Sequence, residues 1–115
     1  MWFTNEQTSV GVCSGTVVEF TAASIAAGGS LKPTPNVAIT QALTSTIESL
    51  CDPNGITMNS AGDLTVANAA NNSLVEYTAQ QIKTSGETVP NLLITGTATT
   101  LTTPAGLTYG PLSLQ

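Results

Sequence analysis

Histidine and arginine are absent from this 115-residue sequence, and lysine occurs only at Lys32 and Lys83. Without histidine, the chain lacks the commonest general base and metal ligand, which excludes Ser-His and Cys-His nucleophile pairs. Two lysines cannot supply the several phosphate contacts that nucleic-acid binding needs, and they disfavour adhesion to anionic membranes. We therefore expect no enzyme, no nucleic-acid partner, no metal site and no cofactor.

Charged residues of either sign make up only 8% of the chain, against about a quarter in typical soluble domains. The seven acidic residues stand singly, so no pair of neighbouring carboxylates marks a hydrolase site. Polarity comes instead from Ser, Asn, Gln and above all from 20 threonines. Threonine favours half-exposed sheet positions, and an uncharged polar surface costs less to desolvate than a charged one. This composition predicts a β-rich surface suited to burial against other protein chains.

Long apolar runs are missing as well. No segment approaches the roughly 18 residues of a membrane-spanning helix, and the N-terminal residues have no basic region of a secretory signal. We expect no membrane insertion and synthesis in a cytoplasm without export. The Thr-, Ser- and Asn-rich surface is nevertheless typical of proteins that work outside the cell. A virion protein satisfies both expectations, and so does an exported protein whose leader has been removed.

Only two cysteines occur, Cys13 and Cys51. In an oxidising compartment they can form a disulfide that ties the first strand region to the middle of the chain. Two buried free thiols are the alternative, and the sequence leaves the choice open. There is no Cys-x-x-Cys spacing, so neither a redox motif nor a zinc site is indicated.

The periodicity predicts a single domain over residues 1–115 that is mainly β, either a β-sandwich or a jelly-roll-like fold. Alternating apolar residues on both sides of a Ser60–Asp63 turn predict a hairpin over residues 56–66. Further strands are expected over residues 10–20, 91–100 and 107–114. Residues 71–82 fit a strand or a helix, and the strand is favoured because strands flank it. A turn is expected over Asp52–Gly55, and a calcium loop there is disfavoured.

One short helix is expected near residues 36–50. Thr34 and Pro35 form a helix start, and apolar residues then recur at spacings of four, four and three. The many β-branched residues of this stretch argue for a strand instead. The apolar residues at helical spacing are Ile39, Leu43, Ile47 and Leu50.

Candidate contact residues lie near the two chain ends. Trp2 and Phe3 form an aromatic pair that either anchors in a groove of a neighbouring subunit or folds back onto the core of its own chain. At the other end, apolar residues of the last segment are candidates for the same kind of interface. These are Tyr109, Leu112 and Leu114.

Gly55 to Val66 (GITMNSAGDLTV) resembles the hairpin of bacterial and phage β-sandwich modules of immunoglobulin-like or jelly-roll type. In size, in its Thr-, Ala- and Gly-rich composition and in lacking a signal, the chain also resembles small phage head-decoration (cement) proteins. This resemblance rests on size and composition and not on a sequence motif, so no functional residues are carried over from that class of proteins. It implies a virion structural protein on the particle surface, a capsid decoration or minor capsid subunit, that forms homo-oligomers and packs against a major capsid protein.

Two further hypotheses stay open. An extracellular fibre or pilus subunit, or an adhesion module, would use strand addition between subunits and would suit a Cys13–Cys51 disulfide. A small domain that binds a glycan or a peptide would need aromatic platforms, and few residues can provide them. They are Trp2, Tyr77 and Tyr109.

Overall fold

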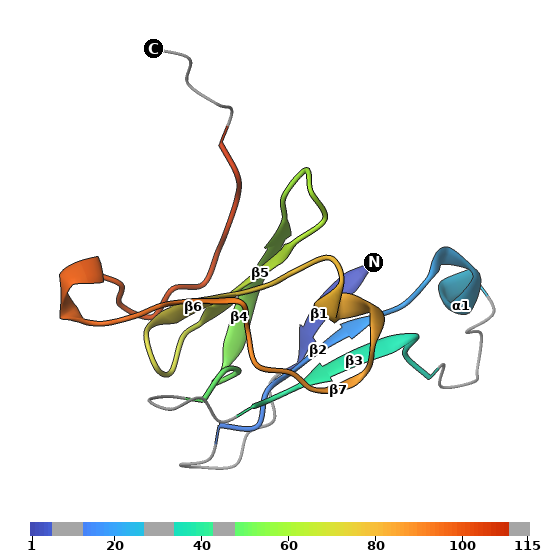
Figure 1. The fold of residues 1–115 in the computed structure, drawn as a ribbon, viewed down its shortest axis with the longest axis horizontal. Coiled ribbons are helices and arrows are strands. Elements are labelled where there is room, and N and C mark those ends of the chain that lie inside the picture. Colours follow the sequence, from blue (N-terminus) through green and yellow to red (C-terminus); the bar gives the residue numbers. More distant parts are fainter. Residues whose placement is uncertain (6–12, 27–33, 43–47, 111–115) are drawn as a thin grey trace.

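The computed structural model describes residues 1–5, 13–26, 34–42 and 48–110. Two four-stranded sheets pack face to face as a β-sandwich-like fold (Figure 1). The first sheet has the strand order β1-β2-β3-β7, and the second has the order β4-β5-β6-β8. The strands of the first sheet are β1 (Trp2–Asn5), β2 (Thr16–Glu19), β3 (Val37–Thr40) and β7 (Gly86–Glu87). Those of the second are β4 (Pro53–Met58), β5 (Leu64–Asn68), β6 (Ser73–Tyr77) and β8 (Leu92–Ile94).

All pairings are antiparallel except that of β3 with β7. After β6, the chain passes through a 3₁₀ turn, η1 (Gln81–Lys83), pairs briefly in the first sheet as β7, and returns to the second sheet as β8. The other helical elements are α1 (Ala22–Ala26) and the 3₁₀ turn η2 (Thr97–Thr99), which lie at opposite ends of the molecule (Figure 1). Among the described residues, no helix is long and apolar enough to cross a membrane.

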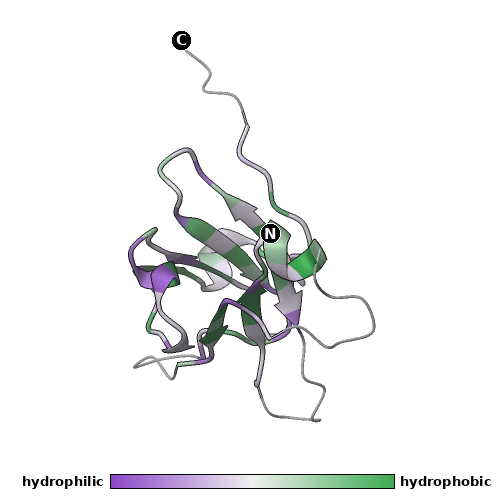
Figure 2. Ribbon diagram, turned by 90° about the vertical axis from the view of Figure 1, so that its right-hand side faces the viewer, coloured by the Kyte–Doolittle hydropathy of each residue, from purple (hydrophilic) through white to green (hydrophobic). Residues whose placement is uncertain are grey.

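The core lies between the sheets and follows the two-residue period of the strands. In β3, Val37 and Ile39 point inward while the alternate residues are half-buried, and β6 repeats this pattern with Val75 and Tyr77. Figure 2 shows hydrophobic residues along the strands of the fold. The buried apolar cluster consists of Val17, Val37, Ile39, Leu50, Leu64, Val66, Val75, Tyr77 and Ile82.

The predicted hairpin is confirmed. β4 and β5 pair antiparallel around a turn in which the Asn59 side-chain oxygen accepts hydrogen bonds from the backbone N–H groups of Ala61 and Asp63, both at 2.9 Å. Gly62 has a φ of 88°, which glycine adopts without the penalty that a Cβ would bring. The strand interpretation of residues 71–82 is confirmed for Ser73–Tyr77, which form β6, whereas Gln81 and Ile82 belong to η1.

The helix predicted near residues 36–50 is wrong. Val37–Thr40 form β3, which pairs with β2 on one side and β7 on the other. Residues 43–47 lie outside the described part, and Ser49 and Leu50 that follow them are buried without being helical. The β-branched side chains and the backbone pairing offered by β2 outweigh the helical spacing, because tertiary pairing overrides a weak local pattern.

Two other local predictions need correction. Asp52 turns the chain with a φ of 54°, but Pro53, Asn54 and Gly55 belong to β4, where a bulge absorbs the irregularity. Residues 107–110 form no strand, and residues 111–115 lie outside the described part. Within the predicted strand region 10–20, the described residues form a strand only in β2, and residues 10–12 lie outside the described part. Within the predicted region 91–100, only β8 is a strand.

Candidate functional site

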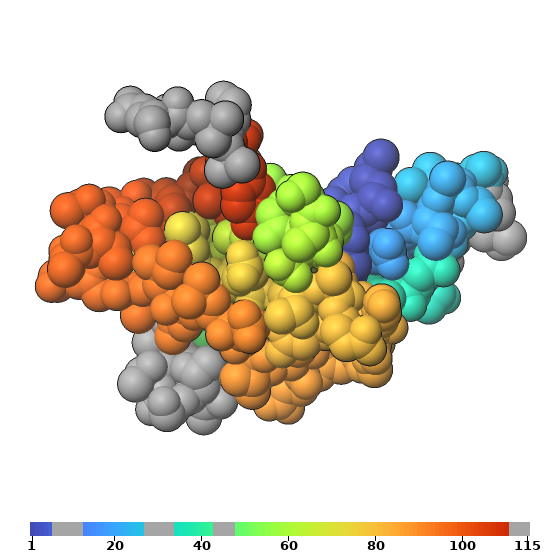
Figure 3. All heavy atoms as spheres, turned by 45° about the horizontal axis from the view of Figure 1, so that its top comes forward, coloured from blue at the N-terminus to red at the C-terminus, as the bar shows by residue number. Residues whose placement is uncertain are grey.

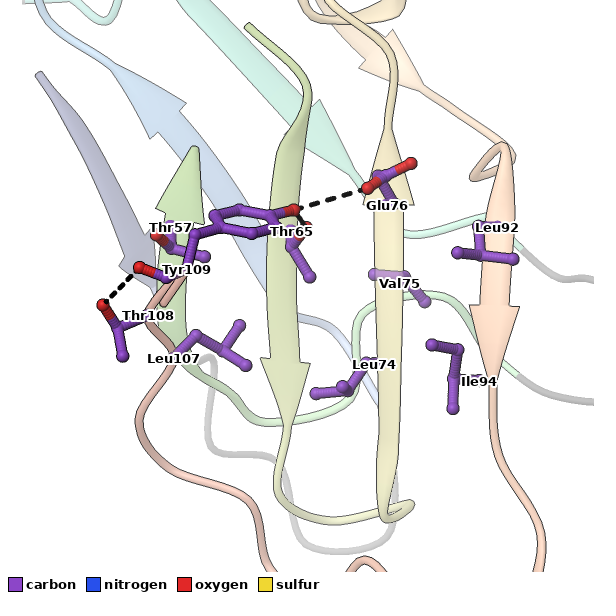
Figure 4. Close-up of a pocket in the computed structure, with 10 residues that line it drawn as sticks. All are labelled: Thr57, Thr65, Leu74, Val75, Glu76, Leu92, Ile94, Leu107, Thr108 and Tyr109. Atoms are coloured by element: carbon purple, nitrogen blue, oxygen red, sulfur yellow. Dashed lines mark hydrogen bonds between the residues drawn. The ribbon is translucent and has the colours of Figure 1, made fainter. Parts of the chain in front are cut away.

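The outer face of the second sheet carries an apolar groove of about 270 Å³ (Figure 4). Leu74 on β6 forms its floor, and Leu92 and Ile94 on β8 form one wall. The opposite wall is the C-terminal segment, with Leu107, Thr108 and Tyr109. Leu92 and Ile94 are 45% and 40% exposed, so the groove presents apolar side chains to solvent.

Tyr109 fixes the position of the C-terminal wall. Its hydroxyl lies 2.6 Å from the hydroxyl of Thr65 on β5, and it donates a longer hydrogen bond of 3.4 Å to the carboxylate of Glu76 on β6. Since the Tyr109 proton goes to Glu76, the hydroxyl of Thr65 can donate to the Tyr109 oxygen. The ring therefore lies across two strands, and Glu76, the carboxylate that lines the groove, already has a partner.

A close backbone contact brings this segment onto the sheet. A Cβ at Gly55 of β4 would lie 2.5 Å from the carbonyl oxygen of Ala105 and 3.2 Å from the Cα of Gly106. Only glycine therefore lets the segment cross β4 at this distance. Figure 3 shows the C-terminal segment, in red, lying against the green β4–β5 hairpin.

A second apolar patch lies at the end of the first sheet. Phe3 and Phe20 meet edge to face with ring centroids 6.0 Å apart. Together with Met1 and Ile25 they line an open hollow of about 370 Å³. Phe3 and Ile25 are 42% and 47% exposed. The hollow therefore presents apolar side chains to solvent and is a second candidate contact surface.

The N-terminal aromatic pair was predicted either to contact a neighbouring subunit or to fold back onto its own core, and the two residues behave differently. Trp2 packs against the core of its own chain, whereas Phe3 points outward, because neighbouring residues of β1 face opposite sides of the sheet. The ammonium group of Met1 donates to the Phe20 carbonyl at 2.7 Å, which pins the start of β1. Of the other predicted contact residues, Tyr109 lines the groove, and Leu112 and Leu114 lie outside the described part.

A buried polar network supports the second sheet from inside. The side-chain amide of Asn68 donates to the Ser49 carbonyl at 2.8 Å and to the Ser73 hydroxyl at 3.1 Å, and its oxygen accepts from the Cys51 N–H at 3.2 Å. Asn71, the residue of a glycosylation sequon that would carry the glycan, donates a hydrogen bond from its side-chain amide to the Glu48 carbonyl at 2.9 Å. These polar groups have a structural role, since their hydrogen-bonding capacity is used within the fold.

The structure resolves the open question about the cysteines. Cys13 and Cys51 are joined by a disulfide with a Cα–Cα distance of 4.4 Å. The Glu48 carboxylate lies close by, and the donor atoms of these three residues are all within 4.8 Å of one another. A cysteine binds a metal ion as a thiolate, and a disulfide has no thiolate. The bridged cysteines therefore do not form a metal site together with Glu48.

Tyr77 was a candidate aromatic platform for a glycan, but it is fully buried and cannot serve as one. Four residues that line the groove were not predicted as contact residues from the sequence: Leu74, Leu92, Ile94 and Leu107. No sequence signal distinguishes the outward positions of β8, because Leu92, Leu93 and Ile94 are all apolar. Only the structure shows that Leu93 packs against the core and that Leu92 and Ile94 are exposed.

Comparison with protein-family models, with curated proteins and with solved structures finds no match to this chain.

Proposed function

We propose that this chain is a non-enzymatic structural subunit of a virion, a capsid decoration (cement) or minor capsid protein. It acts at the virion surface by packing against copies of itself and against a major capsid protein. The observation that carries the proposal is the placement of two exposed apolar surfaces, the groove and the Phe3–Phe20 patch, on a chain with few charges. Burying such surfaces releases water from apolar area without desolvating many ions.

Two features support repeated packing of identical subunits. The apolar surfaces belong to different sheets, so one copy can contact more than one neighbour. Aromatic residues are enriched at the centres of protein interfaces, and each surface contains at least one, Tyr109 or Phe3. In a shell of many copies, a weak contact of this kind stabilises the whole assembly because each contact is repeated.

Light scattering on the purified chain tests this function. We expect a mass that is a multiple of 11.7 kDa, in the form of a trimer or a larger ring, and no binding to a panel of glycans. A folded monomer at every concentration would refute self-assembly. Binding to one glycan class would favour an adhesion module in its place.

The Cys13–Cys51 disulfide favours one alternative, an extracellular fibre or pilus subunit or adhesion module, because disulfides persist mainly in oxidising compartments. Thiol labelling of the chain produced in a reducing cytoplasm separates the two proposals. A chain that assembles equally well with free thiols fits a virion protein made in a cytosol. A chain that requires the bridge to fold fits an exported subunit.

A further inference from the structure

We propose that residues Leu112–Leu114 of one copy add as an extra strand to the free edge of β8 in a second copy. This inference rests on the proposed function and names the partner of β8, the strand that forms one wall of the groove. That partner is the C-terminal segment of an identical chain.

The acceptor is the outer edge of the second sheet. β8 pairs with β6 on one side, and no described strand pairs with its other side. An unpaired edge presents backbone donors and acceptors to any extended chain beside it. Within β8, Leu93 packs against the core, whereas Leu92 and Ile94 point outward along one wall of the groove. The edge therefore offers two apolar side chains spaced two residues apart (Figure 4).

The donor sequence has the same period. Leu112 and Leu114 flank Ser113, so an extended backbone would place both leucines on one face of the sheet. Beside β8, they would form cross-strand pairs with Leu92 and Ile94. Pro111 lacks an N–H and fits the first residue of an edge strand. Residues 110–115 contain no charged side chain, so their burial carries no ion desolvation cost.

The C-terminal residues Leu112–Leu114, here called the tail, cannot reach the β8 edge of their own copy while Tyr109 keeps its hydrogen bonds to the second sheet. The Tyr109 hydroxyl meets Thr65 on β5, and its backbone lies on the β4 side of that strand (Figure 4). A strand added beyond β8 lies three strand spacings from β5, about 14 Å. The three residue steps from Tyr109 to Leu112 cover at most about 11 Å. The donor must therefore come from a second copy.

Donor and acceptor are different surfaces, so the contact is heterologous. It extends into a ring or a filament, or closes when two copies exchange their tails. One variant that keeps only the donor and another that keeps only the acceptor should then form a single capped pair.

Light scattering on four proteins tests the proposal: the parent chain, a tail variant, an edge variant and a control. The tail variant is Leu112→Ser with Leu114→Ser, and the edge variant is Leu92→Ser with Ile94→Ser. The matched control is Met58→Ser with Val89→Ser, which changes two apolar side chains that are 43% and 58% exposed and lie outside the groove. Circular dichroism checks that each protein is folded, and the tail variant changes only residues beyond the described fold.

We expect the parent and the control to assemble, and the tail and edge variants each to fall to 11.7 kDa. An equal mixture of those two variants should form a pair of twice that mass. A tail variant that keeps the mass of the parent overturns strand addition but leaves self-assembly intact. Two monomeric variants that fail to pair overturn exchange between copies, and a monomeric parent overturns both this inference and self-assembly.

Discussion

Tyr77 makes the stability of this fold sensitive to alkaline pH. It stands on β6 among the core side chains, is fully buried, and its hydroxyl has no hydrogen-bond partner among the described residues. Burial raises the pKa of Tyr77 from 10.0 to about 12 because the phenolate is poorly solvated there. The nearby Ser49 hydroxyl opposes part of this shift without reaching hydrogen-bonding geometry.

The direction of the effect follows from proton binding. Below pH 10 the phenol is protonated in both states, and its contribution to stability is fully present. Between pH 10 and the folded-state pKa of about 12, the unfolded chain loses this proton while the folded chain keeps it. The free energy of unfolding then falls by up to about 1.4 kcal/mol for each pH unit, which amounts to about 2 kcal/mol at pH 12 and approaches about 3 kcal/mol at higher pH.

Urea unfolding at stepped pH, followed by the fluorescence of Trp2, the single tryptophan, measures this loss. Tyr77→Phe should remove it. The same variant should be at least as stable as the parent at neutral pH, because a buried hydroxyl without a partner costs about 1–3 kcal/mol. Tyr109→Phe is the matched control and should keep the alkaline loss, because it removes an exposed hydroxyl and leaves Tyr77 unchanged.

Two results would refute this reasoning. The first is an alkaline loss of equal size in the parent and in Tyr77→Phe. The second is a Tyr77→Phe variant that is clearly less stable than the parent at neutral pH, which would mean that the hydroxyl makes a stabilising hydrogen bond.

Three further predictions concern the disulfide, the C-terminal segment and the hairpin turn. Reducing Cys13–Cys51, which are 38 residues apart, should lower the free energy of unfolding by about 4 kcal/mol; equal urea midpoints with and without reductant would contradict this. Gly55→Ala should push the segment at Ala105 off β4 and speed its hydrogen exchange and proteolysis, whereas unchanged protection would show that the close contact is not required. The pKa of Asp63 is lowered by hydrogen bonds from the Asn59 side chain and a backbone N–H, so its stabilisation is present above pH 3.8 and lost as pH falls through the folded-state pKa. Asp63→Asn should remove that part of the acid sensitivity in acid titrations followed by circular dichroism.

Local patterns predicted the parts of the fold that local physics controls. The β4–β5 hairpin followed from alternating apolar residues and a turn that asparagine and glycine stabilise within five residues. The β-rich class followed from threonine and other β-branched residues. β3 was mistaken for a helix because Ile39 begins a run of apolar residues at helical spacing, and its pairing with β2 depends on residues about 20 positions earlier.

The candidate site was harder to predict than the fold. Phe3 and Tyr109 were predicted as contact residues because aromatic residues near chain ends favour interfaces, and the structure places both on exposed apolar surfaces. The sequence did not identify the β8 wall, since a three-residue strand has too short a period to show which residues face outward. It also could not separate Trp2 from Phe3, because the inward face of β1 is defined only by the sheet behind it.

By itself, the sequence determined what this protein lacks and what its surface is made of. Without histidine or arginine, and with two lysines, it has few groups for catalysis or phosphate binding, and its threonines favour sheet. Only the tertiary structure decided that Cys13 meets Cys51, that Tyr77 is buried and that the C-terminal segment crosses β4 at Gly55 to complete a groove. These features depend on contacts between segments far apart in the chain, whose free energy comes from packing and backbone pairing that no local pattern records.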